Sequence, residues 1–231
     1  MRTRAAFNPR PCASMPSNSS SPPRAPLIVK LGGSLHASPA RAEWIAALRR
    51  YPYSLTLVPG GGPFADVVRA AQPTMRFDDA TAHAMAALAM EQYALALASL
   101  HEELMLAASF DAIANAHAQG RIALWRPSAM VAGAKDIAPG WDATSDSLAA
   151  WLARKTGAHT LLVVKSVDVR DGASLEDILR MGVVDSAFPT YLDGTPLHVA
   201  GPAALARAAQ LLADGVPPGA RIETSKQKIA S

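Results

Sequence analysis

Short apolar runs that end in glycine and are followed by helix-like sequence constrain the fold of this chain more than any other feature. Residues 27–31 (LIVKL) lie between Pro26 and two glycines, and residues 53–58 lead through Pro59 into three consecutive glycines. Each run has the length of a strand buried on both faces, and each glycine loop precedes a segment with helical periodicity. Alternating strands and helices favour parallel strands joined by right-handed crossovers. The predicted fold is therefore an α/β, three-layer αβα sandwich with a mainly parallel central sheet.

The rest of the chain continues this alternation. Further strands are expected at residues 121–125, 160–165, 197–200 and 220–223, and helices over 39–50, 63–71, 145–156, 175–181 and 202–213. An alanine- and methionine-rich stretch over residues 78–106 is predicted to be helical, with a break near His101. Its apolar side chains suit either the core or a subunit interface. We expect a homo-oligomer that associates through this helix.

The first 26 residues differ in composition from the rest. They contain four arginines, six prolines, five serines and no acidic residue. We expect a disordered or spuriously translated tail over residues 1–26, followed by a single domain over residues 27–231. A transit peptide is the alternative, although the prolines disfavour the amphipathic helix that such a signal needs.

Charge and cysteine content limit the classes of binding partner and the cellular compartment that we expect for this protein. Without the four arginines of the tail, 18 of the 22 basic residues remain, against 19 acidic ones. A near-neutral domain argues against a nucleic-acid partner. No apolar run is long enough to span a bilayer, and Cys12 is the only cysteine, so no disulfide can form within the chain. We expect a cytoplasmic protein without a membrane partner.

Two of the predicted strands end in a lysine, Lys30 in KLGGS and Lys165 in VVKSVD. Ligands of open α/β sheets bind beyond the carboxyl ends of the strands. Gly32 and Gly33 allow backbone amides to approach a ligand, and Ser34 adds a hydroxyl group. Amides and a lysine that converge in this way suit a phosphate group. The alternative for KLGGS is a tight turn with an exposed lysine.

The glycines after the second strand form another candidate anion site. Gly60, Gly61 and Gly62 precede Pro63, which suits the first turn of a helix. The amino terminus of a helix attracts anions. Three adjacent glycines cost conformational entropy, which a ligand or close packing could offset. Two such sites indicate two phosphate-bearing ligands or one ligand with several phosphates.

Acidic and hydroxyl side chains gather in residues 141–147 (WDATSDS). Asp142 and Asp146 share a helix face if the helix begins at that point. One interpretation is a carboxylate that orients lysines, and the other is simple capping of the helix. If the strands of Lys30 and Lys165 are neighbours, the two lysines must share an anion because like charges repel.

Together KLGGS, PGGG, TSDS and VVKSVD resemble, in order and spacing over residues 27–231, the amino acid kinase family. The resemblance implies an enzyme that transfers the γ-phosphoryl group of ATP to a carboxylate, carbamate or phosphate without a covalent enzyme intermediate. It implies ATP with Mg²⁺, where ATP carries the metal ion and no protein side chain binds it directly. The roles implied are catalytic for Lys30, Asp146 and Lys165, ATP-binding for Gly32, Gly33, Ser34, Lys165 and Asp168, and acceptor-binding for Gly60, Gly61, Gly62, Asp142, His83 and Gln92.

Two further segments resemble one subgroup within this family. Residues 82–97 and 182–188 are similar to a subgroup of small kinases in methanofuran synthesis, which implies 5-(aminomethyl)-3-furanmethanol phosphate as the acceptor. Kinases of uridylate, isopentenyl phosphate or an amino-acid carboxylate are alternatives, and so is a noncatalytic nucleotide-binding or storage protein with the same fold. The short loop after Lys165 leaves recognition of the nucleotide base open. A structural role is the alternative for His83, since no metal-ligand spacing accompanies it.

Overall fold

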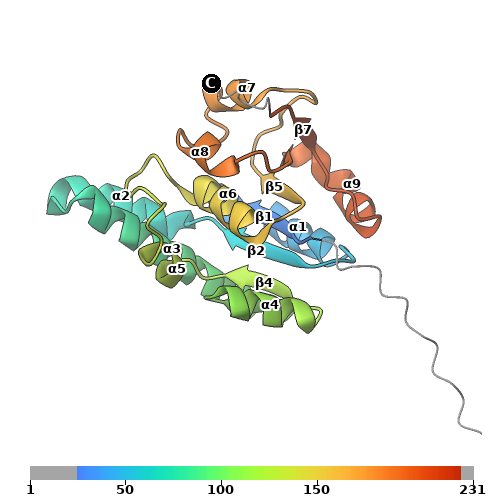
Figure 1. The fold of residues 1–231 in the computed structure, drawn as a ribbon, viewed down its shortest axis with the longest axis horizontal. Helices are drawn as coiled ribbons and strands as arrows, with labels where there is room; N and C mark the ends of the chain where they lie inside the picture. Colours follow the sequence, from blue (N-terminus) through green and yellow to red (C-terminus); the bar gives the residue numbers. More distant parts are fainter. Residues whose placement is uncertain (1–24, 225–231) are drawn as a thin grey trace, which may run out of the picture.

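One sheet organises the part of the chain that the computed structural model describes, residues 25–224. Its seven strands follow the order β3-β4-β2-β1-β5-β6-β7, so that β1 lies in the middle (Figure 1). All neighbouring strands are parallel except β6 and β7, which are antiparallel. The strands are β1 Leu27–Leu31, β2 Leu55–Pro59, β3 Leu104–Ala107, β4 Ile122–Trp125, β5 Thr160–Val164, β6 Leu197–Ala200 and β7 Ala220–Ile222.

Helices cover both faces of this sheet, and each face has its own apolar core. Helices α4, α6 and α8 pack on one face, and α1, α3 and α9 pack on the other. The predicted three-layer sandwich is therefore confirmed. The helical elements are η1 Gly33–Ala37 (a 3₁₀ helix), α1 Ala40–Leu48, α2 Gly62–Met75, α3 Asp79–Leu100, α4 Phe110–Ala118, α5 Ser128–Ala132, α6 Ser145–Thr156, α7 Leu175–Arg180, α8 Phe188–Leu192 and α9 Pro202–Ala213.

Side-chain alternation along β1 explains which groups reach which face. Leu27, Val29 and Leu31 belong to the core beneath α1, α3 and α9, whereas Ile28 belongs to the core beneath α6. Successive residues of a strand point to opposite faces. Lys30 therefore shares the face of Ile28, which is the face that α6 covers.

The region predicted to be helical over residues 78–106 is only partly so. Helix α3 ends at Leu100, in agreement with the expected break near His101, but residues 104–107 form the edge strand β3. Leucine and methionine have high helix propensity, yet this short run pairs with β4 along its whole length. The tertiary context thus overrides the local preference.

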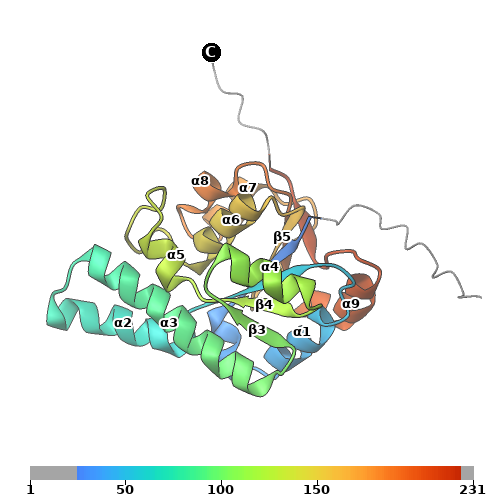
Figure 2. The same cartoon turned by 60° about the horizontal axis from the view of Figure 1, so that its bottom comes forward.

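Helices α2 and α3 pack side by side as a hairpin that extends beyond the sheet (Figure 2). Asp78 caps α3 because its carboxylate accepts a hydrogen bond of 2.7 Å from the Thr81 amide. Helix α2 begins at the triple-glycine loop, and α3 packs against α2. The hairpin therefore lies beside the candidate anion site of that loop.

The last two residues of the predicted tail contact the start of β5. Residues 1–24 lie outside the described residues, but Ala25 and Pro26 belong to the domain. The Pro26 carbonyl accepts a hydrogen bond of 3.1 Å from the His159 amide, next to the start of β5. The ring of His159 contacts the Ala25 carbonyl at 2.7 Å. These contacts join Ala25 and Pro26 to the segment that begins β5.

Candidate active site

Two lysines and one aspartate meet at the carboxyl edge of the sheet. Strand β1 pairs directly with β5, and the register places Lys30 opposite Val163. Lys165 follows two residues later and so points to the same face as Val163 and Lys30. The ammonium of Lys30 lies 2.8 Å from Oδ1 of Asp146, and that of Lys165 lies 2.6 Å from Oδ2. The topology thus brings together three residues that are far apart in the sequence.

Burial makes this cluster electrostatically unusual. Lys30 is 4% exposed and Asp146 is 5% exposed. Burial alone would raise the pKa of Asp146, but the two ammonium groups hold it below its ordinary value. Burial, together with the charge of Lys30, lowers the pKa of Lys165 to about 8, although Asp146 opposes that shift. Two cations share one carboxylate, which leaves one excess positive charge, and a bound anion would compensate it.

Helix α6 positions Asp146 in its first turn, and a distant aspartate caps that turn. Oδ2 of Asp185 accepts hydrogen bonds from the Thr144 amide (2.9 Å), the Thr144 hydroxyl (2.7 Å) and the Ser147 amide (3.1 Å). Oδ1 of Asp185 accepts a further bond from the Ser147 hydroxyl. A carboxylate is favourable at the amino terminus of a helix because of the unpaired amides there. Asp185 therefore holds the backbone that carries Asp146.

The two glycine loops contact each other through their backbones. A Cβ atom at Gly60 would lie 2.5 Å from the Gly33 nitrogen, and one at Gly33 would lie 2.7 Å from the Gly62 nitrogen. Gly62 also has a positive φ of 53° at the first turn of α2. Close packing thus accounts for glycine at these positions without any ligand. The same packing brings the amino termini of η1 and α2 together at one edge.

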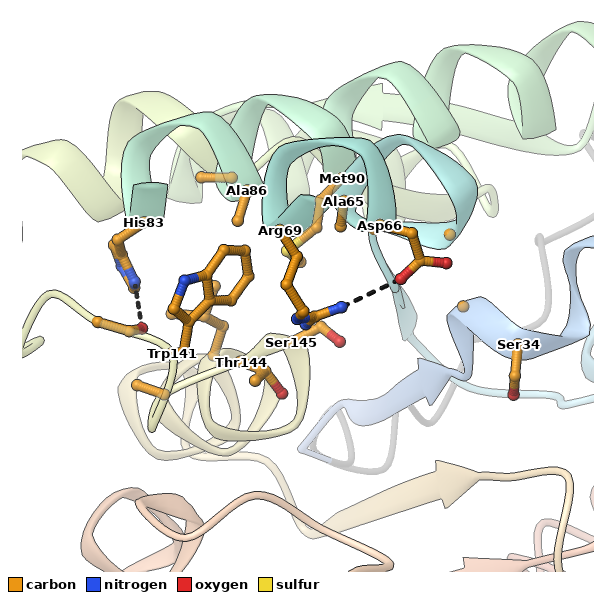
Figure 3. Close-up of a pocket in the computed structure, with 17 residues that line it drawn as sticks. Ser34, Ala65, Asp66, Arg69, His83, Ala86, Met90, Trp141, Thr144 and Ser145 are labelled. Atoms are coloured by element: carbon orange, nitrogen blue, oxygen red, sulfur yellow. Dashed lines mark hydrogen bonds and ion pairs between the residues drawn. The ribbon is translucent and has the colours of Figure 1, made fainter. Parts of the chain in front are cut away.

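A cavity of about 250 Å³ opens beside this edge, between the α2–α3 hairpin and the segment before α6 (Figure 3). Five of the predicted site residues line it: Gly33, Ser34, Gly61, Gly62 and His83. Thr144 and Ser145 also line it and connect it to the Asp146 cluster. Its apolar wall comes from α3 and α6 and includes Ala86, Ala87, Met90 and Leu148.

His83 is a buried member of the cavity wall. Its Nδ1 lies 3.2 Å from the Gly140 carbonyl, and a carbonyl oxygen can only accept, so Nδ1 is the donor. The neutral ring then presents Nε2 as an acceptor. Among the described residues, this buried Nε2 has no hydrogen-bond partner. The His83 ring is therefore a polar group enclosed in the wall at this end of the cavity.

Three predicted site residues belong neither to the cavity wall, nor to the two glycine loops, nor to the Lys30–Asp146–Lys165 cluster. Gln92 is exposed on α3 and does not line it. Asp142 precedes α6, which begins at Ser145, so it does not share a helix face with Asp146, and its carboxylate accepts a 3.2 Å hydrogen bond from Ser186. Asp168 accepts a 2.9 Å hydrogen bond from the Ala203 amide and so caps α9. Asp168 therefore serves as a helix cap, whereas Asp142 contacts a residue 44 positions away in the sequence.

Four residues of the site are absent from the sequence prediction: Asp66, Arg69, Trp141 and Asp185. The spacing of Asp66 and Arg69 is that of an ion pair on one helix face, which is a detectable signal. Asp185 gives no comparable signal, because the turn that it caps lies 41 residues away in the sequence.

Fold and site together describe an αβα protein whose central strands end in a buried cation cluster suited to a polyphosphate. A model of the amino acid kinase family matches residues 25–173, and the chain belongs to this family. Over 184 residues it is 26% identical to the [5-(aminomethyl)furan-3-yl]methyl phosphate kinase of Methanocaldococcus jannaschii, covering 71% of this chain and 82% of that protein.

Solved structures show the same fold. The uridylate kinase of Archaeoglobus fulgidus superposes with a TM-score of 0.64 at 16% identity, covering 85% of this chain and 99% of that one. The UMP kinase of Bacillus anthracis superposes with a TM-score of 0.60 at 17% identity, covering 88% and 98%. The named relatives are kinases, and family membership makes this chain a phosphotransferase.

Two further features of residues 25–224 concern metal ions and membranes. No group of three or more histidine, cysteine, aspartate or glutamate side chains in this range is arranged to hold a metal ion. No helix in it combines the length and apolar character needed to cross a bilayer.

Proposed function

We propose that this protein transfers the γ-phosphoryl group of ATP to a small phosphorylated acceptor, with 5-(aminomethyl)-3-furanmethanol phosphate as the substrate and its diphosphate as the product. The reaction would serve the synthesis of a methanofuran-type one-carbon carrier in the cytoplasm. The observation that carries the proposal is the pairing of Lys30 and Lys165 with the two oxygens of Asp146 beside a glycine-lined cavity. The curated relative named above supports the choice of acceptor.

The proposed chemistry is a direct in-line transfer. An oxygen of the acceptor phosphate attacks the γ-phosphorus of ATP, the bond from that phosphorus to the bridging oxygen breaks, and ADP leaves with that oxygen. A phosphate acceptor is already ionised at neutral pH, so the step needs no general base. Positioning and neutralisation of charge then supply the catalysis. ATP would enter as its magnesium complex.

Each part of the site has a role in this proposal. Lys30 and Lys165 neutralise charge on the transferred phosphoryl group and on the ATP phosphates, and Asp146 holds both ammonium groups in place. In this proposal the amides of Gly32 and Gly33 and the Ser34 hydroxyl bind ATP, and the Gly61–Gly62 amides and the His83 ring bind the acceptor. Gly33, Ser34, Gly61, Gly62 and His83 line one cavity, which would let the two ligands meet.

The acceptor assay decides between the proposed substrate and its rivals. Purified protein is incubated with MgATP and one acceptor at a time, and ADP release is measured. The acceptors are 5-(aminomethyl)-3-furanmethanol phosphate, uridylate, isopentenyl phosphate and amino-acid carboxylates. We expect the aminomethylfuran phosphate to give the highest kcat/KM. Preference for another acceptor would refute the substrate, and ATP binding without any acceptor-dependent ADP release would indicate a noncatalytic protein.

The same assay tests Lys30 through Lys30→Met, which keeps the apolar stem and removes the charge. The remaining Lys165–Asp146 pair is neutral, so we expect the fold to persist while turnover falls at least about 100-fold. Lys155→Met removes a lysine that pairs with Asp136 outside the site, and it serves as the control. Near-normal turnover in Lys30→Met would remove Lys30 from the mechanism.

We also propose that two copies of the chain associate through α3. Leu88 and Leu95 are 50% and 51% exposed, and their seven-residue spacing puts them on the same helix face. Gln92 lies between them and is also exposed. This uncharged stripe is a part of the predicted interface that keeps apolar surface exposed.

A further inference from the structure

The cavity beside the cation cluster contains its own positive charge. Of the described residues that line it, Arg69 is the only lysine or arginine. Lys30 and Lys165 are not part of the lining, and both are already paired with Asp146. An acceptor that brings a phosphate into this cavity therefore meets Arg69 as the cation of the described cavity wall.

Two contacts hold the guanidinium of Arg69 at the cavity wall. Its Nη1 lies 3.0 Å from Oδ1 of Asp66, one turn earlier on α2, and its Cζ lies 4.5 Å from the centre of the Trp141 ring. Figure 3 shows the guanidinium between the Trp141 ring and the end of the cavity where Ser34 lies.

Trp141 is itself anchored, so it forms a fixed platform. Its Nε1 donates a 2.6 Å hydrogen bond to Oε1 of Gln72. The amide nitrogen of Gln72 donates to Oδ1 of Asp79 at 2.8 Å and to the Phe77 carbonyl at 3.3 Å. Gln72 thus ties the loop that carries Trp141 to both helices of the α2–α3 hairpin.

Stability alone gives little reason for this arrangement. The side chains of Arg69 and Asp66 are 54% and 71% exposed, and ion pairs in such positions contribute little to stability. A cation–π contact at an exposed site is also weak. The exposure does, however, leave the remaining N–H groups of the guanidinium open to a ligand. A planar guanidinium matches two phosphate oxygens at once.

We propose that Arg69 binds the phosphate of the acceptor, and that Asp66 and Trp141 position its guanidinium. The inference rests on the proposed function, because it assumes that the acceptor already carries a phosphate. It makes Arg69 the residue that selects a phosphate monoester over the corresponding alcohol. The excess charge of the Lys30–Asp146–Lys165 cluster is then left for ATP.

The test measures binding without ATP, so that it does not depend on turnover. Isothermal titration calorimetry compares 5-(aminomethyl)-3-furanmethanol phosphate with its parent alcohol on wild type and on Arg69→Gln. We expect wild type to prefer the phosphate, and Arg69→Gln to bind the phosphate about 10- to 100-fold more weakly while its affinity for the alcohol stays within about 3-fold. Arg207→Gln, an equal charge loss at an exposed position on α9, should behave as wild type.

A second variant separates charge from geometry. Arg69→Lys keeps the positive charge but lacks the planar fork, so its affinity for the phosphate should fall between those of wild type and Arg69→Gln. The proposal is overturned if Arg69→Gln binds the phosphate as tightly as wild type, or if wild type shows no preference for phosphate over alcohol. Binding of the phosphate without ADP release would instead refute the proposed function and leave the role of Arg69 standing.

Discussion

Lys30, Asp146 and Lys165 are individually ordinary residues whose properties come from where they lie. An aspartate with two ammonium groups 2.6 and 2.8 Å away stays ionised despite its burial. A lysine in the same cluster loses its proton more readily, because burial and a neighbouring cation both disfavour its charge. The ionisation of Lys165 is therefore the property of this site that is most open to measurement.

We expect the reaction to lose rate in alkaline solution because Lys165 loses its charge. With a pKa of about 8 for Lys165 in the free chain, kcat/KM for ATP should fall about tenfold for each pH unit above that value. The unfolded chain keeps this proton up to its ordinary pKa of 10.5, so between about pH 8 and 10.5 the unfolded state binds more protons. The contribution of Lys165 to stability therefore rises with pH in that window, opposite to the rate.

The pH profile of kcat/KM is measured together with thermal unfolding at each pH. Lys165→Arg, which stays charged, should move the alkaline limb to higher pH if the variant retains activity. A rate that stays level up to pH 9.5 would show that the charge of Lys165 is not required.

At the level of elements, the site depends on how α6 begins. Residues 141–147 suggest capping from within the segment, but Thr144 makes no side-chain capping bond and the cap comes from Asp185. That aspartate lies just before α8, which packs against α6 on the same side of the sheet. The position of Asp146 therefore depends on contact between two elements that are not consecutive in the chain.

Replacing Asp185 by alanine should destabilise the protein by about 2–4 kcal/mol, since the buried amide and hydroxyl of Ser147 lose their acceptors. The free energy of unfolding is measured by urea denaturation. Ser186→Ala, next in the sequence and exposed, is the matched control and should stay within about 0.5 kcal/mol of wild type. An Asp185→Ala variant as stable as wild type would show that water or other groups replace the cap.

At the level of the whole molecule, the α2–α3 hairpin extends beyond the sheet and carries both a wall of the cavity and the exposed stripe of α3 (Figure 2). Association through that stripe would place a second copy against the helix that carries His83. Association of two copies would then make α3 more rigid, and acceptor binding at His83 would depend on the oligomeric state.

We expect wild type to be dimeric and the double variant Leu88→Glu with Leu95→Glu to be monomeric, because four like charges would face one another in the interface. Size-exclusion chromatography with light scattering measures the mass. Ala203→Glu on α9, exposed on another helix, controls for the added charge and should leave the dimer intact. A wild-type monomer, or a dimer that survives both substitutions, would exclude this interface.

The layers, the parallel sheet and the polar ends of the strands follow from the local sequence. Residues 27–31, apolar except for one lysine near the end, have few options other than a buried strand, and that lysine and the glycines after it must lie at the strand's carboxyl end. These are local constraints of periodicity and length, and they can be read without knowing any neighbour. They predicted Lys30 and Lys165 at strand ends and left open whether the two lysines meet. The resemblance to the amino acid kinase family, and not periodicity, implied that Asp146 joins them.

The tertiary structure alone decided which of these ends meet. Only the strand order shows that β1 lies beside β5, and only packing shows that Asp185 caps α6, that Asp168 caps α9 and that Arg69 faces the cavity. Lateral order and contacts between distant elements arise from the cooperative fit of all layers at once. A short stretch of sequence does not reveal these contacts, because each of them joins residues that are far apart along the chain.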